Sequence, residues 1–144
     1  MRHHREKCLL PYSQDQLFSL VADVKSYPEF LPWCLGARIL ETNTTGFDAE
    51  LAIGFKMVRE SFKSRVILNR PSHIEINYLD GPFKDLKNSW LFKKTDQTDE
   101  CQIDFFLEFE FKSPILESLI GLLLEDAIRR MVNAFEARAN HIYR

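Results

Sequence analysis

The chain has only 3 cysteines among its 144 residues. Cys8, Cys34 and Cys101 are too few and too odd in number for the disulfide framework of a small secreted domain, so we expect a reducing compartment. The apolar runs are much shorter than the ~20 residues of a membrane-spanning helix, and we expect no such helix. With 45% hydrophobic and 28% charged residues, the composition argues against disorder, collagen and coiled coil.

An excess of positive charge is also lacking. The chain carries 19 basic and 21 acidic side chains, a net charge of −2, so no global positive field attracts nucleic acid and we expect no DNA partner. Basic residues do cluster locally between Lys56 and Arg65. On strands such residues usually form cross-strand pairs or a solvated face, although a ribosomal subunit stays open as an alternative partner.

Catalytic and metal-binding motifs are missing as well. The sequence holds no glycine-rich phosphate loop and no HExxH, CxxC or GxSxG motif. We interpret His3 and His4 as part of a frayed, solvated terminus rather than as metal ligands. Cys34 is interpreted as a buried thiol, because no nearby His or Lys is evident that would lower its pKa. We therefore predict no catalytic residue, no metal ligand and no enzymatic activity.

Helices are indicated near both ends of the chain. Ser13 and Gln16 form a capping box, which predicts a helix directly after them. Ser113 as N-cap and Pro114 at the first helical position predict a second helix. It extends to about Tyr143, about 30 residues or roughly 45 Å at 1.5 Å per residue. Its apolar stripe, at 3.6-residue spacing, comprises Leu116, Ile120, Leu123, Leu124, Ala127, Ile128, Met131, Ala134 and Phe135.

Between these helices the hydrophobic period changes to two. Each alternating segment has one apolar and one polar face, as in an antiparallel sheet with one wet side. A short apolar stretch, Cys8–Pro11, precedes the first helix. The expected order is therefore one strand, a helix, about six antiparallel strands and a long helix. The alternating segments are 47–55, 62–68, 74–78, 86–92 and 103–111.

These elements predict a single α+β domain over residues 1–144. A curved antiparallel sheet of about six or seven strands wraps around the long C-terminal helix, which alone is large enough to cover the apolar face. A cavity is expected where the curvature exceeds what side chains fill. We predict that it is lined mostly by apolar side chains, with Asn88 as a polar exception: Phe30, Trp33, Phe55, Phe62, Tyr78, Asn88, Trp90, Phe105, Leu107, Phe109, Ile120, Leu123, Ile128 and Met131.

One segment of the long helix is too apolar for an ordinary surface helix. Between Ile115 and Leu124, seven of ten residues are apolar, which indicates either burial on all sides or contact with something else. We hypothesise that this segment and the proline-rich turn at 27–33 form the mouth of the cavity and touch a membrane interface transiently. The side chains expected there are Phe30, Leu31, Trp33, Leu119 and Leu122.

Four motifs in order resemble a known family. They are residues 27–34 (YPEFLPWC), 58–62 (VRESF), 80–84 (DGPFK) and 109–114 (FEFKSP). They are similar to those of the coenzyme-Q-binding START-domain family, which includes mitochondrial coenzyme Q chaperones and bacterial ribosome-association toxins. The likeness covers residues 8–139, nearly the whole chain. It implies the helix-grip fold, START-like and related to polyketide cyclases.

The resemblance also implies a function. We expect non-enzymatic binding and transport of a polyisoprenoid quinone such as ubiquinone, which supports respiratory electron transport or quinone biosynthesis and requires no cofactor. Two alternatives stay open: a toxin that binds a ribosomal subunit and blocks subunit joining, and an aromatase or cyclase on the same fold. The expected location is the bacterial cytoplasm at the inner membrane, or the mitochondrial matrix side in a eukaryote.

Overall fold

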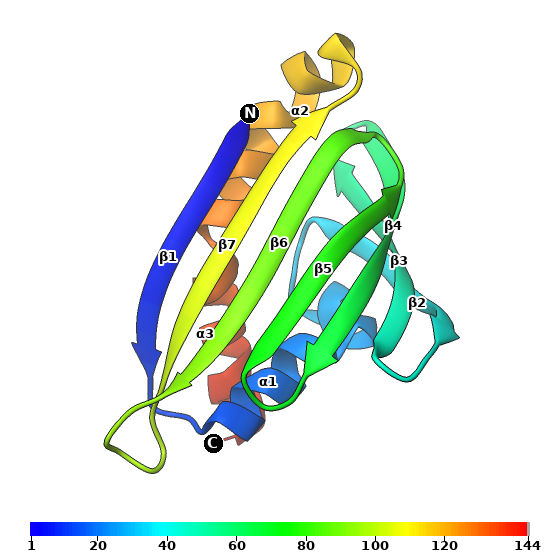
Figure 1. Cartoon of the computed structure of the whole chain (residues 1–144). Helices are drawn as coiled ribbons and strands as arrows, with labels where there is room; N and C mark the ends of the chain where they lie inside the picture. Colours follow the sequence, from blue (N-terminus) through cyan, green and yellow to red (C-terminus); the bar gives the residue numbers. More distant parts are fainter. Residues whose placement is uncertain (144) are drawn as a thin grey trace.

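The computed structural model describes residues 1–143. Seven strands form one sheet in the order β1-β7-β6-β5-β4-β3-β2, and every neighbouring pair is antiparallel. The sheet is strongly curved, and the helices lie on its concave side (Figure 1). The elements are β1 (Arg2–Leu10), α1 (Gln14–Ala22), the 3-10 helix η1 (Val24–Glu29), β2 (Cys34–Thr42), β3 (Gly46–Phe55), β4 (Val58–Asn69), β5 (His73–Asp80), β6 (Phe83–Lys94), β7 (Cys101–Phe111), α2 (Pro114–Arg129) and α3 (Met131–Tyr143).

This architecture confirms the predicted α+β helix-grip fold. The alternation read from the sequence corresponds to burial, and β7 is the clearest case, because every second residue from Cys101 to Phe111 is buried. Both predicted N-caps are present. Ser13 and Gln16 form the capping box of α1, and the Ser113 hydroxyl accepts hydrogen bonds from the backbone N–H groups of Ile115 and Leu116.

Two strands differ from the prediction. The expectation of a frayed terminus is wrong, because β1 pairs with β7 from Arg2 opposite Phe109 to Leu10 opposite Cys101. Its inward positions include Arg2, which bonds to carboxylates of α2, so the strand lacks an apolar alternation. The irregular strand β2 was not predicted either, since two register shifts interrupt its pairing with β3.

The C-terminal helix is broken where a continuous helix was predicted. Arg130 separates α2 from α3 with φ −97° and ψ 1°, and its N–H donates to the carbonyls of Ala127 and Ile128. No proline or glycine marks this position. After the break, the adjacent residues Met131 and Val132 are both buried. The predicted stripe residues Leu123, Ala127 and Ala134 are half-buried.

The two ends of the domain are packed differently. At one end, α1 lies beside α3, where the Tyr143 hydroxyl donates to the Gln16 carbonyl at 2.8 Å and Tyr12 hydrogen-bonds to Asn140. At the other end, the start of α2 extends past the sheet, close to the N-terminus of the chain (Figure 1). The first end is thereby closed by helix packing, whereas one groove lined by Met1 and Pro114 and another lined by Gly54 and Lys56 lie toward the second, open end.

Candidate functional site

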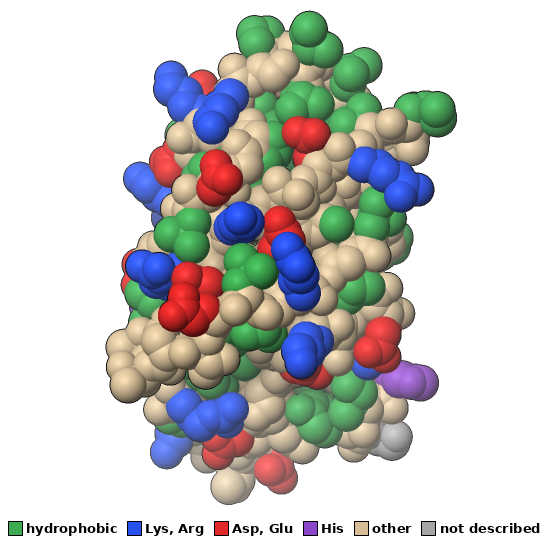
Figure 2. Space-filling model, turned by 90° about the vertical axis from the view of Figure 1, so that its right-hand side faces the viewer, with side chains coloured by type: hydrophobic (Ala, Val, Ile, Leu, Met, Phe, Trp, Pro, Cys, Tyr) green, Lys and Arg blue, Asp and Glu red, His purple; other side chains and the backbone are tan. Residues whose placement is uncertain are grey.

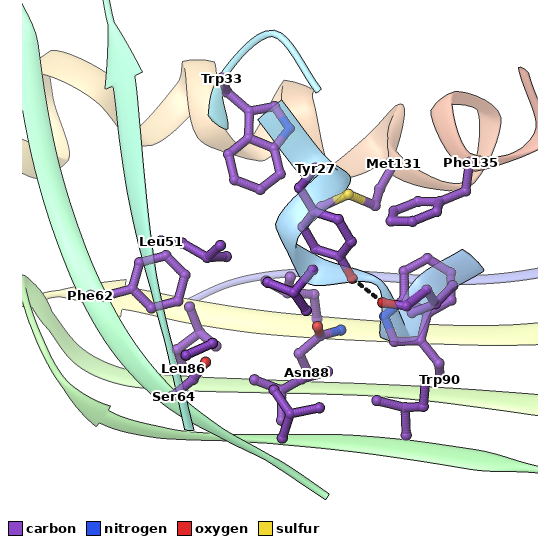
Figure 3. Close-up of a pocket in the computed structure, with 17 residues that line it drawn as sticks. Tyr27, Trp33, Leu51, Phe62, Ser64, Leu86, Asn88, Trp90, Met131 and Phe135 are labelled. Atoms are coloured by element: carbon purple, nitrogen blue, oxygen red, sulfur yellow. Dashed lines mark hydrogen bonds between the residues drawn. The ribbon is translucent and has the colours of Figure 1, made fainter. Parts of the chain in front are cut away.

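A cavity lies between the concave face of the sheet and the helices. Its volume is about 70 Å³, enough for several water molecules but below the roughly 300–1,000 Å³ of pockets that hold drug-sized ligands. Figure 3 shows it from the side, with the sheet below and the helices above. The lining residues are Val21, Val24, Tyr27, Trp33, Ala49, Leu51, Phe62, Ser64, Val66, Ile74, Ile76, Leu86, Asn88, Trp90, Leu107, Met131 and Phe135.

The sheet supplies the floor of this cavity through period-two alternation. Strands β3 to β7 each contribute inward side chains, nearly all apolar. Two polar groups interrupt this floor. The Asn88 amide donates through Nδ2 to the Phe106 carbonyl at 2.8 Å, which leaves its Oδ1 and one N–H. Ser64 is buried in β4 beside the same space.

The roof opposite the sheet includes η1, whose Tyr27 faces the cavity (Figure 3). The Tyr27 hydroxyl donates to the Val21 carbonyl at 2.5 Å, drawn as the dashed line. Burial raises the pKa of this phenol above its ordinary value, because desolvation disfavours the charged form. Tyr27 therefore stays neutral. Its hydroxyl proton is already donated to Val21, so the ring contributes an apolar surface to the cavity wall.

The segment after η1 is fixed against α3. The Phe30 ring packs edge-on against Phe135 with 5.1 Å between centroids. The Arg138 guanidinium lies over the Phe30 ring, 5.1 Å from its centroid, and Arg138 Nη2 donates to Glu29 at 3.0 Å. The Arg138 Nε is buried and has no hydrogen-bond partner among the described residues. These contacts hold the roof segment down over the cavity.

A second, more open groove lies on the outer side of Trp33. Its volume is about 480 Å³, and Trp33 lines both this groove and the inner cavity. The indole therefore forms the partition between them. The groove lies between the β3–β4 hairpin and the junction of α2 with α3. Its lining comprises Leu31, Pro32, Trp33, Gly54, Phe55, Lys56, Leu123, Asp126, Ala127, Arg130 and Ala134.

The structure brings six of the predicted cavity residues together at the inner cavity. Sequence reasoning missed several others that share this space. Val21 and Val24 lie in or directly after the helix that the capping box predicts, Phe135 belongs to the apolar stripe of the C-terminal helix, and Tyr27 lies in the proline-rich turn. The signals were present but were not assigned to the cavity. The six predicted residues that line the inner cavity are Trp33, Phe62, Asn88, Trp90, Leu107 and Met131.

The remaining predicted residues lie outside the inner cavity. Phe105 is buried and packs against Trp90 at 4.6 Å between centroids, so both rings point inward as expected but only Trp90 reaches the cavity. The Tyr78 hydroxyl accepts from the Phe83 N–H at 3.0 Å. Phe55 and Leu123 line the outer groove instead. The others, which pack in the core, are Phe30, Phe109, Ile120 and Ile128.

The predicted mouth is only partly a surface. Leu119 and Leu122 are 56% and 71% exposed. Leu31 is 1% exposed, so its predicted contact with a membrane is wrong, because the side chain is buried at the wall of the outer groove. Phe30 and Trp33 are half-buried, and Phe30 is held by its contacts with Phe135 and Arg138.

Among residues 1–143, no group of three or more His, Cys, Asp or Glu side chains could hold a metal ion. Cys34 is buried, as predicted. Burial raises the pKa of the Cys34 thiol to about 11, which opposes formation of a nucleophilic thiolate. Within the same residues, no helix is both long and apolar enough to cross a membrane.

Comparison with known proteins agrees with this geometry. Over 135 residues the chain is 38% identical to the ribosome association toxin RatA of Escherichia coli K12, covering 94% of this chain and 85% of that protein. It is 32% identical over 143 residues to the mitochondrial coenzyme Q-binding protein COQ10 homolog B of Xenopus laevis, covering 97% and 59%. The Zhui aromatase/cyclase of a Streptomyces species shares the fold, with a TM-score of 0.84, 17% identity and coverage of 99% and 96%.

Family membership follows from a match over most of the chain. Residues 10–136 match the family described as polyketide cyclase/dehydrase and lipid transport. The match spans α1, all strands from β2 to β7, α2 and the first turn of α3. It therefore includes every element that lines the inner cavity. This chain belongs to the polyketide cyclase/dehydrase and lipid-transport family.

Proposed function

We propose that this protein binds and carries a polyisoprenoid quinone. One observation supports this most. An apolar inner cavity and an outer groove lie on opposite sides of a single side chain, Trp33. In this arrangement the ring occupies the inner cavity and the tail follows the groove. Each buried CH₂ contributes ~0.8 kcal/mol, so a prenyl tail supplies most of the affinity. The coenzyme Q-binding name of a relative supports the same ligand class.

Loading requires the inner cavity to expand. At about 70 Å³ it is too small for a substituted quinone ring. The half-buried indole of Trp33 is the movable part of the roof, because Tyr27 is held by its hydrogen bond to Val21 and the strands below are held by backbone ladders. Asn88 and Ser64 are then the polar groups available to the quinone oxygens. They fix the orientation of the head group, while the apolar walls exclude water from it.

A cavity-filling variant tests this proposal. Ala49 is buried in the cavity wall on β3, whereas Ala52 lies on the outer face of the same strand. Ala49→Phe fills the space intended for the ring, and Ala52→Phe is the matched control. The probe is a short-chain benzoquinone. Binding is read from quenching of the two tryptophans, Trp33 and Trp90, which both line the cavity.

The expected result is saturable quenching in the natural chain and in Ala52→Phe, and weak quenching in Ala49→Phe at unchanged fold. Circular dichroism checks the fold of each variant. Equal affinity in both variants contradicts binding in the inner cavity. Absence of saturable quenching in the natural chain contradicts quinone binding altogether.

A ribosomal subunit is the second candidate partner, because the 38% identical E. coli relative is named a ribosome association toxin. The outer face of the sheet carries the basic residues for such contact. Several are already paired, however: Arg65 is 2.9 Å from Asp48, and Lys93 is 2.8 Å from Asp104. This pairing weakens the positive field that RNA binding requires.

Charge reversal on the outer face separates the two candidates. Lys63 and Arg65 are exposed, on the face of β4 opposite the cavity. The double variant Lys63→Glu, Arg65→Glu is expected to keep its quinone affinity. If the protein instead binds a ribosomal subunit through this face, co-sedimentation with the subunit falls steeply in the variant and depends on salt. Loss of quinone binding in this variant contradicts the assignment of inner and outer faces.

A cyclase function is the weaker alternative. Such an enzyme positions a proton donor or acceptor next to the reacting carbons. Among the described residues that line the inner cavity, Tyr27 is the only titratable side chain. Its hydroxyl already donates to the Val21 carbonyl, so the wall offers passive burial rather than acid–base chemistry.

A further inference from the structure

Exposed apolar side chains gather at the open end of the molecule. Met57 is 96% exposed at the tip of the β3–β4 hairpin, and Ile115 is 71% exposed at the start of α2. Leu119 and Leu122 continue the same helix segment with 56% and 71% exposure. Hydrophobic side chains cluster at the upper end of the space-filling view (Figure 2). We refer to Met57, Ile115, Leu119 and Leu122 as the apolar rim.

The apolar rim stands on two separate projections. One is the β3–β4 turn, where Lys56 adopts a left-handed conformation with φ 53° and places Met57 at the tip. The other is the start of α2, which extends beyond the sheet (Figure 1). The outer groove lies between them, since Lys56 lines it from the hairpin side and Leu123 from the helix side. A surface that contacts the rim therefore also covers the mouth of the groove.

The charges on these projections are positive. The segments 56–59 and 112–122 contain three basic side chains, Lys56, Arg59 and Lys112, all exposed. Within the described residues none of the three has an ion-pair partner. The only acidic side chain in the two segments is Glu117. Its carboxylate is neutralised by Arg2, whose Nε lies 2.7 Å from Oε1.

Gly121 makes this neutralisation possible. A Cβ at this position would lie 2.7 Å from Glu117 Oε1 and 3.0 Å from Arg2 Nε, closer than ordinary contacts. The glycine thus leaves room for the ion pair to lie across α2. As a result, the acidic group on the helix points its charge toward β1 and away from the apolar rim.

We propose that the apolar rim docks onto the surface of an anionic phospholipid bilayer, so that the outer groove opens directly into the lipid. The inference rests on the proposed function, since it places the ligand's exit at the membrane. Aliphatic side chains flanked by unpaired lysine and arginine match a bilayer interface, where the apolar groups insert and the cations contact phosphate. The rim contains no tryptophan or tyrosine, the residues that dominate protein–protein hot spots.

Vesicle flotation tests the docking directly, without any ligand. The vesicles are equal parts phosphatidylcholine and phosphatidylglycerol, compared with pure phosphatidylcholine. The test variants are the pair Met57→Glu, Leu122→Glu and the pair Lys56→Glu, Lys112→Glu. The matched control is Leu9→Glu, because Leu9 is 58% exposed on β1 at the closed end of the domain. Thermal unfolding of each variant verifies that it is folded.

We expect the natural chain and Leu9→Glu to float with anionic vesicles and to bind pure phosphatidylcholine weakly. In both test variants the bound fraction should fall roughly tenfold or more. The first pair loses insertion of apolar side chains, and the second loses attraction to the lipid phosphates. Equal flotation of all variants overturns the proposal. If sedimentation velocity instead shows a dimer that the rim variants dissociate, the rim is a contact between copies of this chain, which also overturns it.

Quinone retention separates this inference from the proposed function. Met57→Glu, Leu122→Glu should hold a short-chain quinone as the natural chain does, because neither side chain lines the inner cavity, but should transfer a long-chain quinone to vesicles more slowly. Retention with normal flotation in this variant means that only the docking surface is wrong. Absence of quinone binding in the natural chain, with flotation intact, means that only the ligand is wrong.

Discussion

At the scale of single residues, Trp33 is the side chain on which the proposed binding site depends most. It lines the inner cavity and the outer groove at once, and it is half-buried, so its ring can move without opening the core. The sequence indicated Trp33 both as a cavity residue and as part of a membrane-facing mouth. The partition it forms depends on distant parts of the chain, the β3–β4 hairpin and the α2–α3 junction, which no local pattern reveals.

Removing the indole should therefore accelerate exchange. Trp33→Ala joins the two spaces, so a bound quinone should leave the protein faster and be retained less well. Trp33→Phe keeps an aromatic partition and serves as the control, with exchange near that of the natural chain. The measurement is stopped-flow transfer of quinone to acceptor vesicles. Slower or unchanged exchange in Trp33→Ala contradicts the role of this side chain as a partition.

The buried thiols should make the stability of the fold depend on pH. Burial raises the pKa of Cys34 and of Cys101 from 9.0 to about 11. The folded chain therefore holds these protons more tightly than the unfolded chain. The contribution of the two thiols to the free energy of unfolding is fully present below about pH 9 and is lost between about pH 9 and 11. We expect the urea midpoint to fall across this window less steeply in Cys34→Ala, Cys101→Ala than in the natural chain. Parallel curves would show that other groups cause the decline.

At the scale of elements, local signals located the helix starts well. The hydroxyl of Ser113 accepts from two backbone N–H groups at 3.2 and 3.3 Å, so Ser113→Ala should lower the free energy of unfolding by about 1 kcal/mol. Ser118→Ala, exposed within α2, is the control and should change it by less than about 0.5 kcal/mol. Urea denaturation measures both, and equal effects would contradict the cap.

Elements without a full local signal were missed in whole or in part, and the first strand was predicted only at its apolar end from Cys8 onward. The alternation of β7 is apolar against polar and identified the strand, whereas β1 presents Arg2, His4 and Glu6 inward and reads as a solvated tail. Arg2 is satisfied by a tertiary contact, its ion pair with Glu117, whereas His4 and Glu6 bond to each other along the strand at 2.8 Å. The helix break at Arg130 likewise has no proline or glycine to signal it, and Met131 and Val132 are both buried directly after it. Tertiary context overrides propensity at each of these places.

At the scale of the whole molecule, the fold and the presence of a cavity could be predicted, but the cavity wall could be predicted only in part. Period-two and 3.6-residue patterns tell which face of an element is inward, and every predicted cavity residue on the strands does point inward. They do not tell which inward side chains meet a void and which meet each other, as Trp90 and Phe105 illustrate. One such scaffold hosts binding proteins and enzymes alike, so the function depends on what occupies the void.

The most direct measurement is therefore the identity of the occupant. The protein is purified without detergent from cells that make quinone and extracted with organic solvent, and the extract is analysed by mass spectrometry, with Ala49→Phe prepared in parallel. We expect a polyisoprenoid quinone to co-purify with the natural chain and to be strongly depleted in Ala49→Phe. Equal amounts of quinone in both preparations, or none in the natural chain, would contradict carriage of quinone in the inner cavity.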